Sequence, residues 1–179
     1  MKLEHVFPTP VWFLSTTEDT LTSEALKWAL HQQSILPASQ RSNRLGYQSE
    51  TQFDFHSLEP YWGHVHHRLK EISPDIHYNN WWINVSERGA FNHYHVHPSC
   101  DLAVIWYLTD NHGTLKIRSP YQYSRCDVPE KLFGPTEIAI NAMKGDIVVF
   151  PSDIQHCVEP HHSHEPRVCV SINASINKE

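Results

Sequence analysis

The chain has 179 residues, of which 40% are hydrophobic and 15 are histidines, and its 20 acidic and 14 basic side chains give a formal charge of −6. This length suits one domain with a substantial core, and the hydrophobic content excludes a disordered chain. The negative charge, without a run of Lys or Arg, argues against nucleic-acid or anionic-membrane binding driven by bulk electrostatics. Histidine is the commonest metal ligand, so its surplus is the first indication of a metal site.

The sequence predicts neither a leader peptide nor a membrane span. Its first residues lack an apolar stretch, and no run of about 18 apolar residues occurs anywhere. The cysteines form no C-x-x-C pair, which counts against a zinc knuckle or a thioredoxin-type site, and we expect free thiols in a reducing compartment. We therefore expect a cytoplasmic protein. The cysteines are Cys100, Cys126, Cys157 and Cys169.

Two amphipathic helices are expected in the first half of the chain. Apolar residues recur at helical spacing from residue 21, and this pattern ends near Gln33. A second segment, 59–72, has a proline at an early position and an apolar stripe, and it stops before Pro74. Three histidines of this segment lie off the apolar stripe and are expected to face solvent: His64, His66 and His67.

From residue 77 onward the pattern changes to short β-rich runs separated by Gly, Pro and Asn. Seven or eight such runs predict a β-sandwich, jelly roll or barrel. The expected strands are 81–85, 93–97, 102–108, 114–118, 137–140, 146–150 and 168–176. The last run alternates, so that apolar residues point one way and Arg167, Cys169, Ser171 and Asn173 point the other.

Histidines at alternating positions mark the run 93–97. On a strand such residues share a face, so two adjacent imidazoles can converge on one metal ion. A second segment, 145–156, consists of a glycine turn, an apolar strand, a proline corner and then His156, which can supply a third ligand. The combination predicts a divalent metal site. Imidazole suits Fe, Zn, Cu or Ni, so the ligand type alone does not choose the metal.

Arg167 and Ser171 follow these histidines in the sequence and share one face of the last expected strand. A planar guanidinium with a nearby hydroxyl binds a carboxylate through two hydrogen bonds. A cosubstrate that carries a carboxylate and chelates the metal at its other end would explain this order of residues.

The chain resembles a known superfamily in two motifs, Gly89-x5-His95-x-His97 and Gly145-x5-Pro151-x4-His156. This spacing is similar to that of the cupins, with Asp101 near the place of the cupin glutamate. More specifically, the chain resembles a small family of 2-oxoglutarate/Fe(II)-dependent oxygenases found in bacteria and phages. The similar stretches are 7–12, 42–49, 82–86, 89–92, 95–98, 150–152 with His156, and 167–173.

The resemblance implies a mainly β fold with a double-stranded β-helix core, a cupin-like jelly roll. The chain would be a single domain over residues 1–179. Its helical N-terminal part would cover about 15–74, with two or so helices packed outside a jelly-roll core of about 77–176. The implied cofactors are Fe(II) and 2-oxoglutarate. The implied metal ligands are His95, His97 and His156. The implied cofactor-binding residues are Arg167 on the distal carboxylate, Ser171 as its helper and Tyr107.

Two departures accompany the resemblance. His97 stands where most 2-oxoglutarate oxygenases have Asp or Glu; this family tends to have histidine there, and the ligand set would then be neutral. Asp101 could instead supply an anionic ligand, or it could hydrogen-bond His97 from behind. On the next strand the family usually reads Ser-Gly-Val-Tyr-Tyr, whereas residues 103–107 here read Ala-Val-Ile-Trp-Tyr.

The implied function is a dioxygenase that hydroxylates an unactivated C–H bond and releases succinate and CO2, with no catalytic side chain beyond the metal centre. The expected partners are O2 and a small-molecule or peptide substrate, without nucleic acid or membrane, and a homodimer stays open. One alternative is a three-histidine cupin dioxygenase that does not use 2-oxoglutarate, in which Arg167 holds the substrate carboxylate. The other is a non-enzymatic metal-binding cupin.

Two further groups of side chains carry weaker expectations. Aromatic residues near the expected site are candidates for a dry lining, although at least half should be ordinary core. They are Trp81, Trp82, Tyr94, Trp106 and Tyr107. Histidines between the last expected ligand and Arg167 are expected to be solvated. They are His161, His162 and His164.

Overall fold

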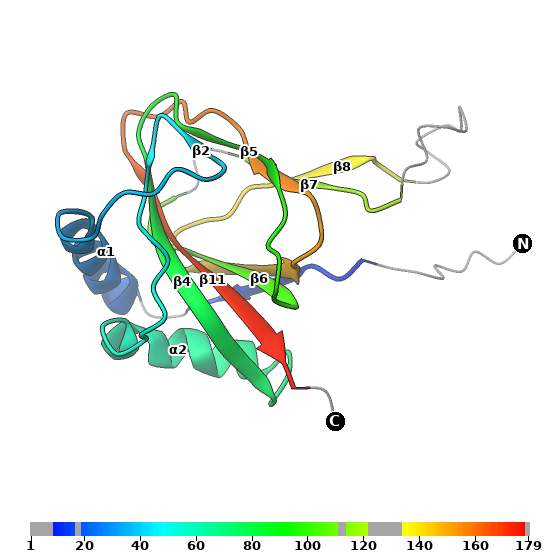
Figure 1. Ribbon diagram of the computed structural model, residues 1–179, viewed down its shortest axis with the longest axis horizontal. Helices are drawn as coiled ribbons and strands as arrows, with labels where there is room; N and C mark the ends of the chain where they lie inside the picture. The colour runs from blue at the N-terminus through cyan, green and yellow to red at the C-terminus, as the bar shows by residue number, and fades with distance from the viewer. Residues whose placement is uncertain (1–8, 17–18, 111–113, 122–133, 178–179) are drawn as a thin grey trace, which may run out of the picture.

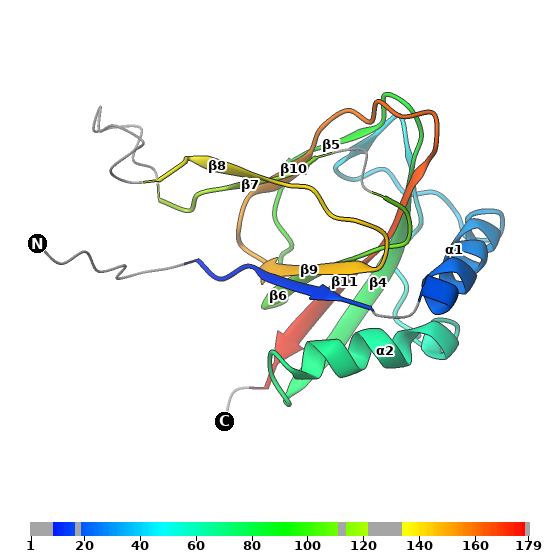
Figure 2. The same cartoon turned by 180° about the vertical axis from the view of Figure 1, so that it is seen from behind.

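Two antiparallel β-sheets face each other in the computed structural model, which describes residues 9–16, 19–110, 114–121 and 134–177 (Figure 1). The six-stranded sheet has the order β1 (Trp12–Ser15), β9 (Asp146–Pro151), β6 (Leu102–Tyr107), β11 (Arg167–Ile176), β4 (Ile76–Ser86) and β3 (Tyr47–Gln48). The five-stranded sheet has the order β2 (Asn43–Arg44), β5 (Phe91–His95), β10 (His156–Val158), β7 (Leu115–Arg118) and β8 (Glu137–Ile140). Seen from behind, β8, β7, β10 and β5 lie over β9 and β6 (Figure 2). The expected mainly β architecture is confirmed.

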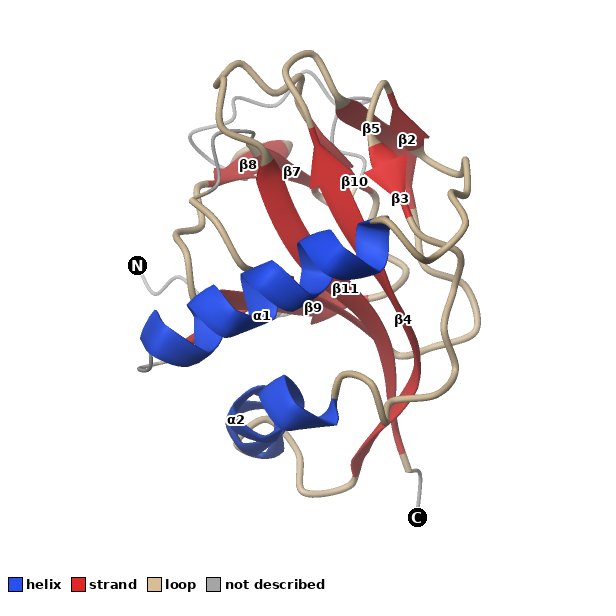
Figure 3. Ribbon diagram, turned by 90° about the vertical axis from the view of Figure 1, so that its left-hand side faces the viewer, coloured by secondary structure: helices blue, strands red, loops and turns tan. Residues whose placement is uncertain are grey.

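Both expected helices form, and both cover the outer face of the six-stranded sheet (Figure 3). They are α1 (Asp19–Gln33) and α2 (Glu59–Lys70). Helix α1 contributes the fully buried Ala25 and Ala29, and α2 contributes Trp62, Val65 and Leu69 to the same core. Neither of these described helices is long and apolar enough to cross a membrane.

Alternation along the central strands separates two cores. On β6, Val104 and Trp106 face the helices, whereas Ile105 and Tyr107 face the opposite sheet. On β11, Val168, Val170 and Ile172 likewise pack on the helix side. The polar residues of β11 therefore point into the space between the sheets, as the alternating sequence predicts.

Several short strands were not predicted: β1, β2, β3 and β10. Strands β2 and β3 have two residues each, too few to show a periodic pattern. Strand β2 pairs with β5 and β3 pairs with β4, so the segment between residues 38 and 52 joins both sheets along one edge of the jelly roll (Figure 3). The N-terminal half is thus not only helical but also forms one side of the space between the sheets.

Both glycines of the cupin-like motifs have a structural role. Gly89 has a φ of 87° and Gly145 a φ of 88°, a left-handed conformation that favours glycine. Gly89 lies in the turn before β5, and Gly145 immediately precedes β9. A Cβ atom at position 145 would also lie 3.0 Å from the hydroxyl of Thr16. These turns direct the chain into the two strands that lead to the histidines.

We expect the substitution Leu69→Ala to lower the free energy of unfolding by about 2–5 kcal/mol, because Leu69 is fully buried between α2 and the sheet. Urea unfolding followed by circular dichroism measures the change. Leu45→Ala, at a leucine that is 78% exposed, is the matched control and should cost less than about 0.5 kcal/mol. Equal losses in the two variants would contradict the assignment of Leu69 to the core.

Candidate metal centre and cofactor pocket

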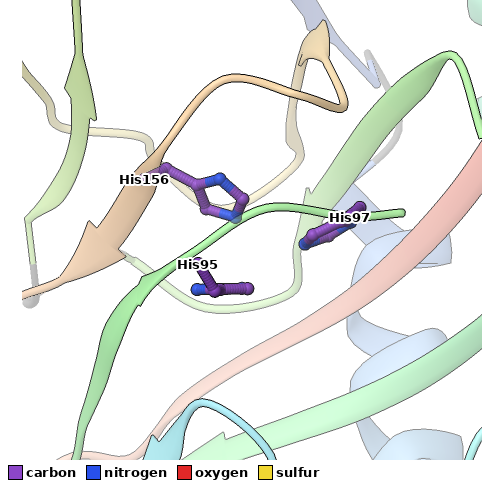
Figure 4. A group of neighbouring side chains, drawn as sticks. All are labelled: His95, His97 and His156. Atoms are coloured by element: carbon purple, nitrogen blue, oxygen red, sulfur yellow. The ribbon is translucent and has the colours of Figure 1, made fainter.

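Three imidazoles converge between the two sheets (Figure 4). His95 ends β5, His156 begins β10, and these two residues are direct partners in the pairing of the two strands. His97 follows two residues after β5, where its backbone N–H donates to the carbonyl of Ser152. One ligand nitrogen from each of the three histidines lies within 4.8 Å of the others. The structure therefore brings the three expected ligands together, although His97 comes from a loop instead of the expected strand.

Hydrogen bonds orient two of the rings through the backbone. Nδ1 of His95 lies 2.8 Å from the carbonyl oxygen of His93, and Nδ1 of His156 lies 2.9 Å from that of Ile154. A carbonyl oxygen can only accept, so each Nδ1 carries the proton and donates it. Nε2 of each ring is then left with a lone pair, which is the form that binds a metal ion.

A pair of amides orients His97. Nδ1 of His97 lies 2.8 Å from Oδ1 of Asn173, and Nδ2 of Asn173 donates to Oδ1 of Asn80 at 2.9 Å. The bond to Asn80 fixes the amide of Asn173 with its oxygen toward the ring, so His97 is also protonated on Nδ1. Sequence reasoning missed this role, although the alternation of the last strand placed Asn173 on the cavity face.

Burial sets the charge of the cluster. Desolvation lowers the pKa of all three imidazoles, and together with the neighbouring imidazoles it lowers the pKa of His97 to about 4 and that of His156 to about 3. His97 and His156 are 6% and 2% exposed. At neutral pH His97 and His156 are therefore uncharged and can bind a divalent cation without first losing a proton.

Asp101 does not lie in this cluster. Its side chain is exposed, and its carboxylate accepts the backbone N–H of Ile176 at 2.9 Å. The side chain that accepts the hydrogen bond of His97 is that of Asn173, not that of Asp101. Among the described residues, the three histidines are the only group of three or more His, Cys, Asp or Glu close enough to hold one ion.

A cavity of about 350 Å³ adjoins the imidazoles. Its wall combines aromatic, amide, hydroxyl and aliphatic side chains with two arginines, and none of its described residues is Asp or Glu. The lining comprises Arg41, Ser42, Gln48, Thr51, Trp82, Asn84, Asn92, His95, Val96, His97, Pro98, Ile105, Tyr107, His156, Val158, Arg167, Cys169, Ser171 and Asn173.

Arg167 lies in this wall and is only 2% exposed. Its Nη2 donates to the hydroxyl of Ser86 at 2.7 Å, and its buried Nε has no hydrogen-bond partner among the described residues. A buried guanidinium with a free donor is costly unless an anion completes its hydrogen bonds. This arrangement fits the carboxylate of a bound cosubstrate.

The hydroxyl that bonds Arg167 belongs to Ser86, on the neighbouring strand. Ser171 accepts a hydrogen bond from Nδ2 of Asn84 at 3.0 Å, whereas Ser86 bonds Arg167. Ser86 and Asn84 were missed because they lie on β4, and only the register of β4 against β11 places Ser86 opposite Arg167. Ser171 still lines the same cavity.

The aromatic candidates divide between cavity and core. Trp82 and Tyr107 line the cavity, and burial raises the pKa of the Tyr107 phenol. Trp81 and Trp106 pack on the helix side, so the departure from the family at position 106 does not reach the cavity. Tyr94 is exposed on the outer face, where its hydroxyl bonds Glu137.

Most of the other histidines discussed above are exposed, with two exceptions. His66 is half-buried and bonds the hydroxyl of Tyr78. His161 is fully buried, so the expectation that it is solvated is wrong. Its ring contacts the carbonyl of Glu165 at 2.6 Å, and its backbone pairs with Ala90, because the loop folds back against the turn before β5. The exposed histidines are His64, His67, His162 and His164.

The three cysteines in the described residues are free, and Cys126 lies outside them. Cys169 lines the cavity, and burial raises the pKa of its thiol.

Comparison with known proteins agrees with this geometry. Residues 80–173 match the family described as "Putative 2OG-Fe(II) oxygenase". No curated protein matches the sequence.

Solved structures share the fold at low sequence identity. The non-heme alpha ketoglutarate dependent epimerase SnoN from nogalamycin biosynthesis superposes with a TM-score of 0.73 at 10% identity, covering 94% of this chain and 77% of SnoN. A prolyl-4-hydroxylase from Pseudomonas putida superposes with a TM-score of 0.67 at 12% identity, covering 95% of this chain and 94% of the hydroxylase. HygX from Streptomyces hygroscopicus, with nickel and 2-oxoglutarate bound, superposes with a TM-score of 0.66 at 11% identity, covering 94% of this chain and 84% of HygX. The expected double-stranded β-helix is thereby confirmed.

We expect the metal-free protein to lose stability as the pH falls from about 6.5 toward 4. In this range the unfolded chain takes up protons on His97 and His156, whereas the folded chain, with pKa values of about 4 and about 3, does not. Each pKa unit is worth about 1.4 kcal/mol. Urea unfolding across this pH range measures the loss. His156→Gln should reduce the dependence of the free energy of unfolding on pH. His67→Gln, at an exposed imidazole, is the control and should keep the dependence of the wild-type protein. A wild-type stability that does not change with pH in this range would contradict the buried neutral cluster.

The variant Asn173→Leu should bind divalent metal about 10- to 100-fold more weakly, because His97 loses the acceptor that orients its ring. Competition with a chromophoric chelator for Zn(II) gives the affinity directly. The control variant Asn177→Leu makes the same change at an exposed position near the end of the described chain, and its affinity for Zn(II) should equal that of the wild-type protein. Equal affinities in all three proteins would rule out the orienting role of Asn173.

Proposed function

The chain belongs to the 2OG-Fe(II) oxygenase family, and from this premise we propose that it is an Fe(II)- and 2-oxoglutarate-dependent dioxygenase that hydroxylates an unactivated C–H bond. The observation that carries the proposal is the convergence of three neutral imidazoles beside a cavity that contains a buried, incompletely bonded arginine. The prolyl-4-hydroxylase among the structural neighbours supports hydroxylation as the outcome.

In this proposal Nε2 of His95, His97 and His156 would hold the iron. The two carbonyls and the amide of Asn173 would keep the rings in the required tautomer and orientation. Because the three ligands are neutral, the ion would keep its full charge of +2. The dianion of 2-oxoglutarate would then neutralise the centre, whereas a carboxylate ligand in place of His97 would leave it at −1.

Arg167 would hold the distal carboxylate of 2-oxoglutarate. Its free Nε would donate to that carboxylate, while Ser86 keeps the guanidinium in position through Nη2. Ser171, held by Asn84, and Tyr107 would line the path between the arginine and the metal. When bound, the iron and 2-oxoglutarate supply the oxidation, in which O2, 2-oxoglutarate and the substrate C–H give succinate, CO2 and the hydroxylated product.

The protein's other contribution would be a site from which water is excluded. Trp82 packs against the imidazole of His97, with ring centroids 5.3 Å apart and planes tilted by 53°, and Ile105 and Val158 add apolar surface to the cavity. Exclusion of water protects reactive species from side reactions. The chain would act as a single domain in the cytoplasm, on a small-molecule or peptide substrate.

Anaerobic titration of the Fe(II)-loaded protein with 2-oxoglutarate should produce a metal-to-ligand charge-transfer band. Arg167→Ala should weaken 2-oxoglutarate binding by about a hundredfold, because the distal carboxylate loses a charged and bidentate partner. Arg88→Ala removes an exposed arginine outside the cavity and should titrate as wild type, and thermal unfolding checks that all three proteins are folded.

Absence of the band in iron-loaded protein would overturn the proposal. Consumption of O2 without 2-oxoglutarate would favour the three-histidine dioxygenase instead. An Arg167→Ala variant that binds 2-oxoglutarate as tightly as wild type would show that Arg167 does not hold it.

A further inference from the structure

We infer that the substrate carries an oxyanion, a carboxylate or a phosphate, and that Arg41 binds it at the mouth of the cavity with Gln48 beside it. This inference rests on the proposed function, in which Arg167 is occupied by 2-oxoglutarate. A second arginine in the same wall is then left for a second anion.

The charge of the cavity is opposite to that of the protein. The chain has 20 acidic and 14 basic residues, yet the described lining of the cavity contains two arginines and no carboxylate. Two positive charges without a negative partner favour anionic ligands in a partly desolvated space. One dianionic cosubstrate offsets only the charge of the metal ion, so the positive charge of the two arginines is left for a second anion.

Two hydrogen bonds within the segment 41–44 fix the backbone of Arg41, one at its N–H and one at its carbonyl. The N–H of Arg41 donates to Oδ1 of Asn43 at 2.8 Å, and its carbonyl accepts from Nη1 of Arg44 at 3.0 Å. Asn43 is itself 7% exposed and donates to the carbonyl of Gly46 at 3.1 Å. The guanidinium of Arg41, by contrast, has no hydrogen-bond or ion-pair partner within the described part of the chain. Arg41 is an exposed residue, so its fixed backbone places the guanidinium where an anion entering from solvent can reach it.

Arg41 is also next to the metal cluster. The hydroxyl of Ser42, the following residue, lies 3.4 Å from Nε2 of His95, the nitrogen that would face the metal. Asn92 donates to the same hydroxyl at 3.1 Å and thereby ties this loop to β5. A group bound by Arg41 would therefore hold the rest of the substrate close to the reacting centre.

Gln48 supplies an independent observation. It is 6% exposed, it lines the cavity, and its side-chain amide has no hydrogen bond within the described residues. Because Gln48 lines the cavity, a ligand that enters can pair with this amide and gain affinity. The volume of about 350 Å³ lies at the lower end for ligand pockets, and the cosubstrate must share it. The substrate group that enters is therefore small, of the size of an amino-acid side chain or a short acid.

Binding of a matched pair of probes tests the inference. The protein with Zn(II) and saturating 2-oxoglutarate is titrated with N-acetylglycine and with N-acetylglycinamide, which differ in charge but hardly in shape, and separately with inorganic phosphate. The readout is the Nε–H resonance of Arg41, assigned by its loss in Arg41→Gln. Arg88→Gln removes the same charge from an exposed position outside the cavity.

We expect an anion to shift the Arg41 resonance and to bind at least about tenfold more tightly than the neutral amide. Arg41→Gln should abolish this preference and Arg88→Gln should keep it. A stronger response to N-acetylglycine identifies a carboxylate and a stronger response to phosphate identifies a phosphate, and both support the inference. Equal binding of acid and amide together with no response of Arg41 to phosphate, or an unchanged preference in Arg41→Gln, would overturn it.

The charge-transfer titration separates this inference from the proposed function. If the band forms in wild type and in Arg41→Gln but no anion depends on Arg41, only the inference fails. If no band forms, the proposed function fails, and repeating the probe titrations without metal and 2-oxoglutarate still shows whether Arg41 binds an anion.

Discussion

The register of β11 between β4 and β6 is the constraint on which the remaining structure depends. Because side chains alternate along a strand, this register sends Val168, Val170 and Ile172 into the core beneath the helices. The same register sends Arg167 and Asn173 into the cavity, where one faces Ser86 and the other orients His97. A shift by one residue would bury the polar set under the helices and expose the apolar set to the cavity, so stability and site geometry are specified together.

The electrostatics of the site follow from its uncharged histidines and from the absence of carboxylates among the described residues that line the cavity. Burial keeps His97 and His156 uncharged, and no acidic side chain among the described residues lines the cavity. Positive charge is therefore supplied by arginines and by the metal, in a protein whose net charge is negative. The local charge of the cavity would therefore favour anions, although the net charge of the chain is negative.

The sequence predicted both helices and the long strands from periodicity, and the three histidines from two motifs together with the family resemblance. It could not place His97 beyond the end of β5, because strand ends depend on partners that are distant in the sequence. The pairing of Arg167 with Ser86, and not with Ser171, likewise requires the register of two strands. The burial of His161 depends on a loop that folds back, for which the sequence offers no periodic signal.

The metal ligands and the arginine belong to different sheets. His95 and His156 lie on β5 and β10 of the five-stranded sheet, whereas Arg167 begins β11 of the six-stranded sheet. In the proposed function, a dicarboxylate connects the metal to Arg167 across the space that the side chains leave between two sheets, whose backbones lie about 10 Å apart in packed sheets. The separation of the sheets, fixed by the core side chains between them, would therefore select the chain length of the cosubstrate. A repacked core, such as a variant at the buried Val148, would alter the preference among shorter and longer 2-oxo acids without changing any residue that lines the cavity.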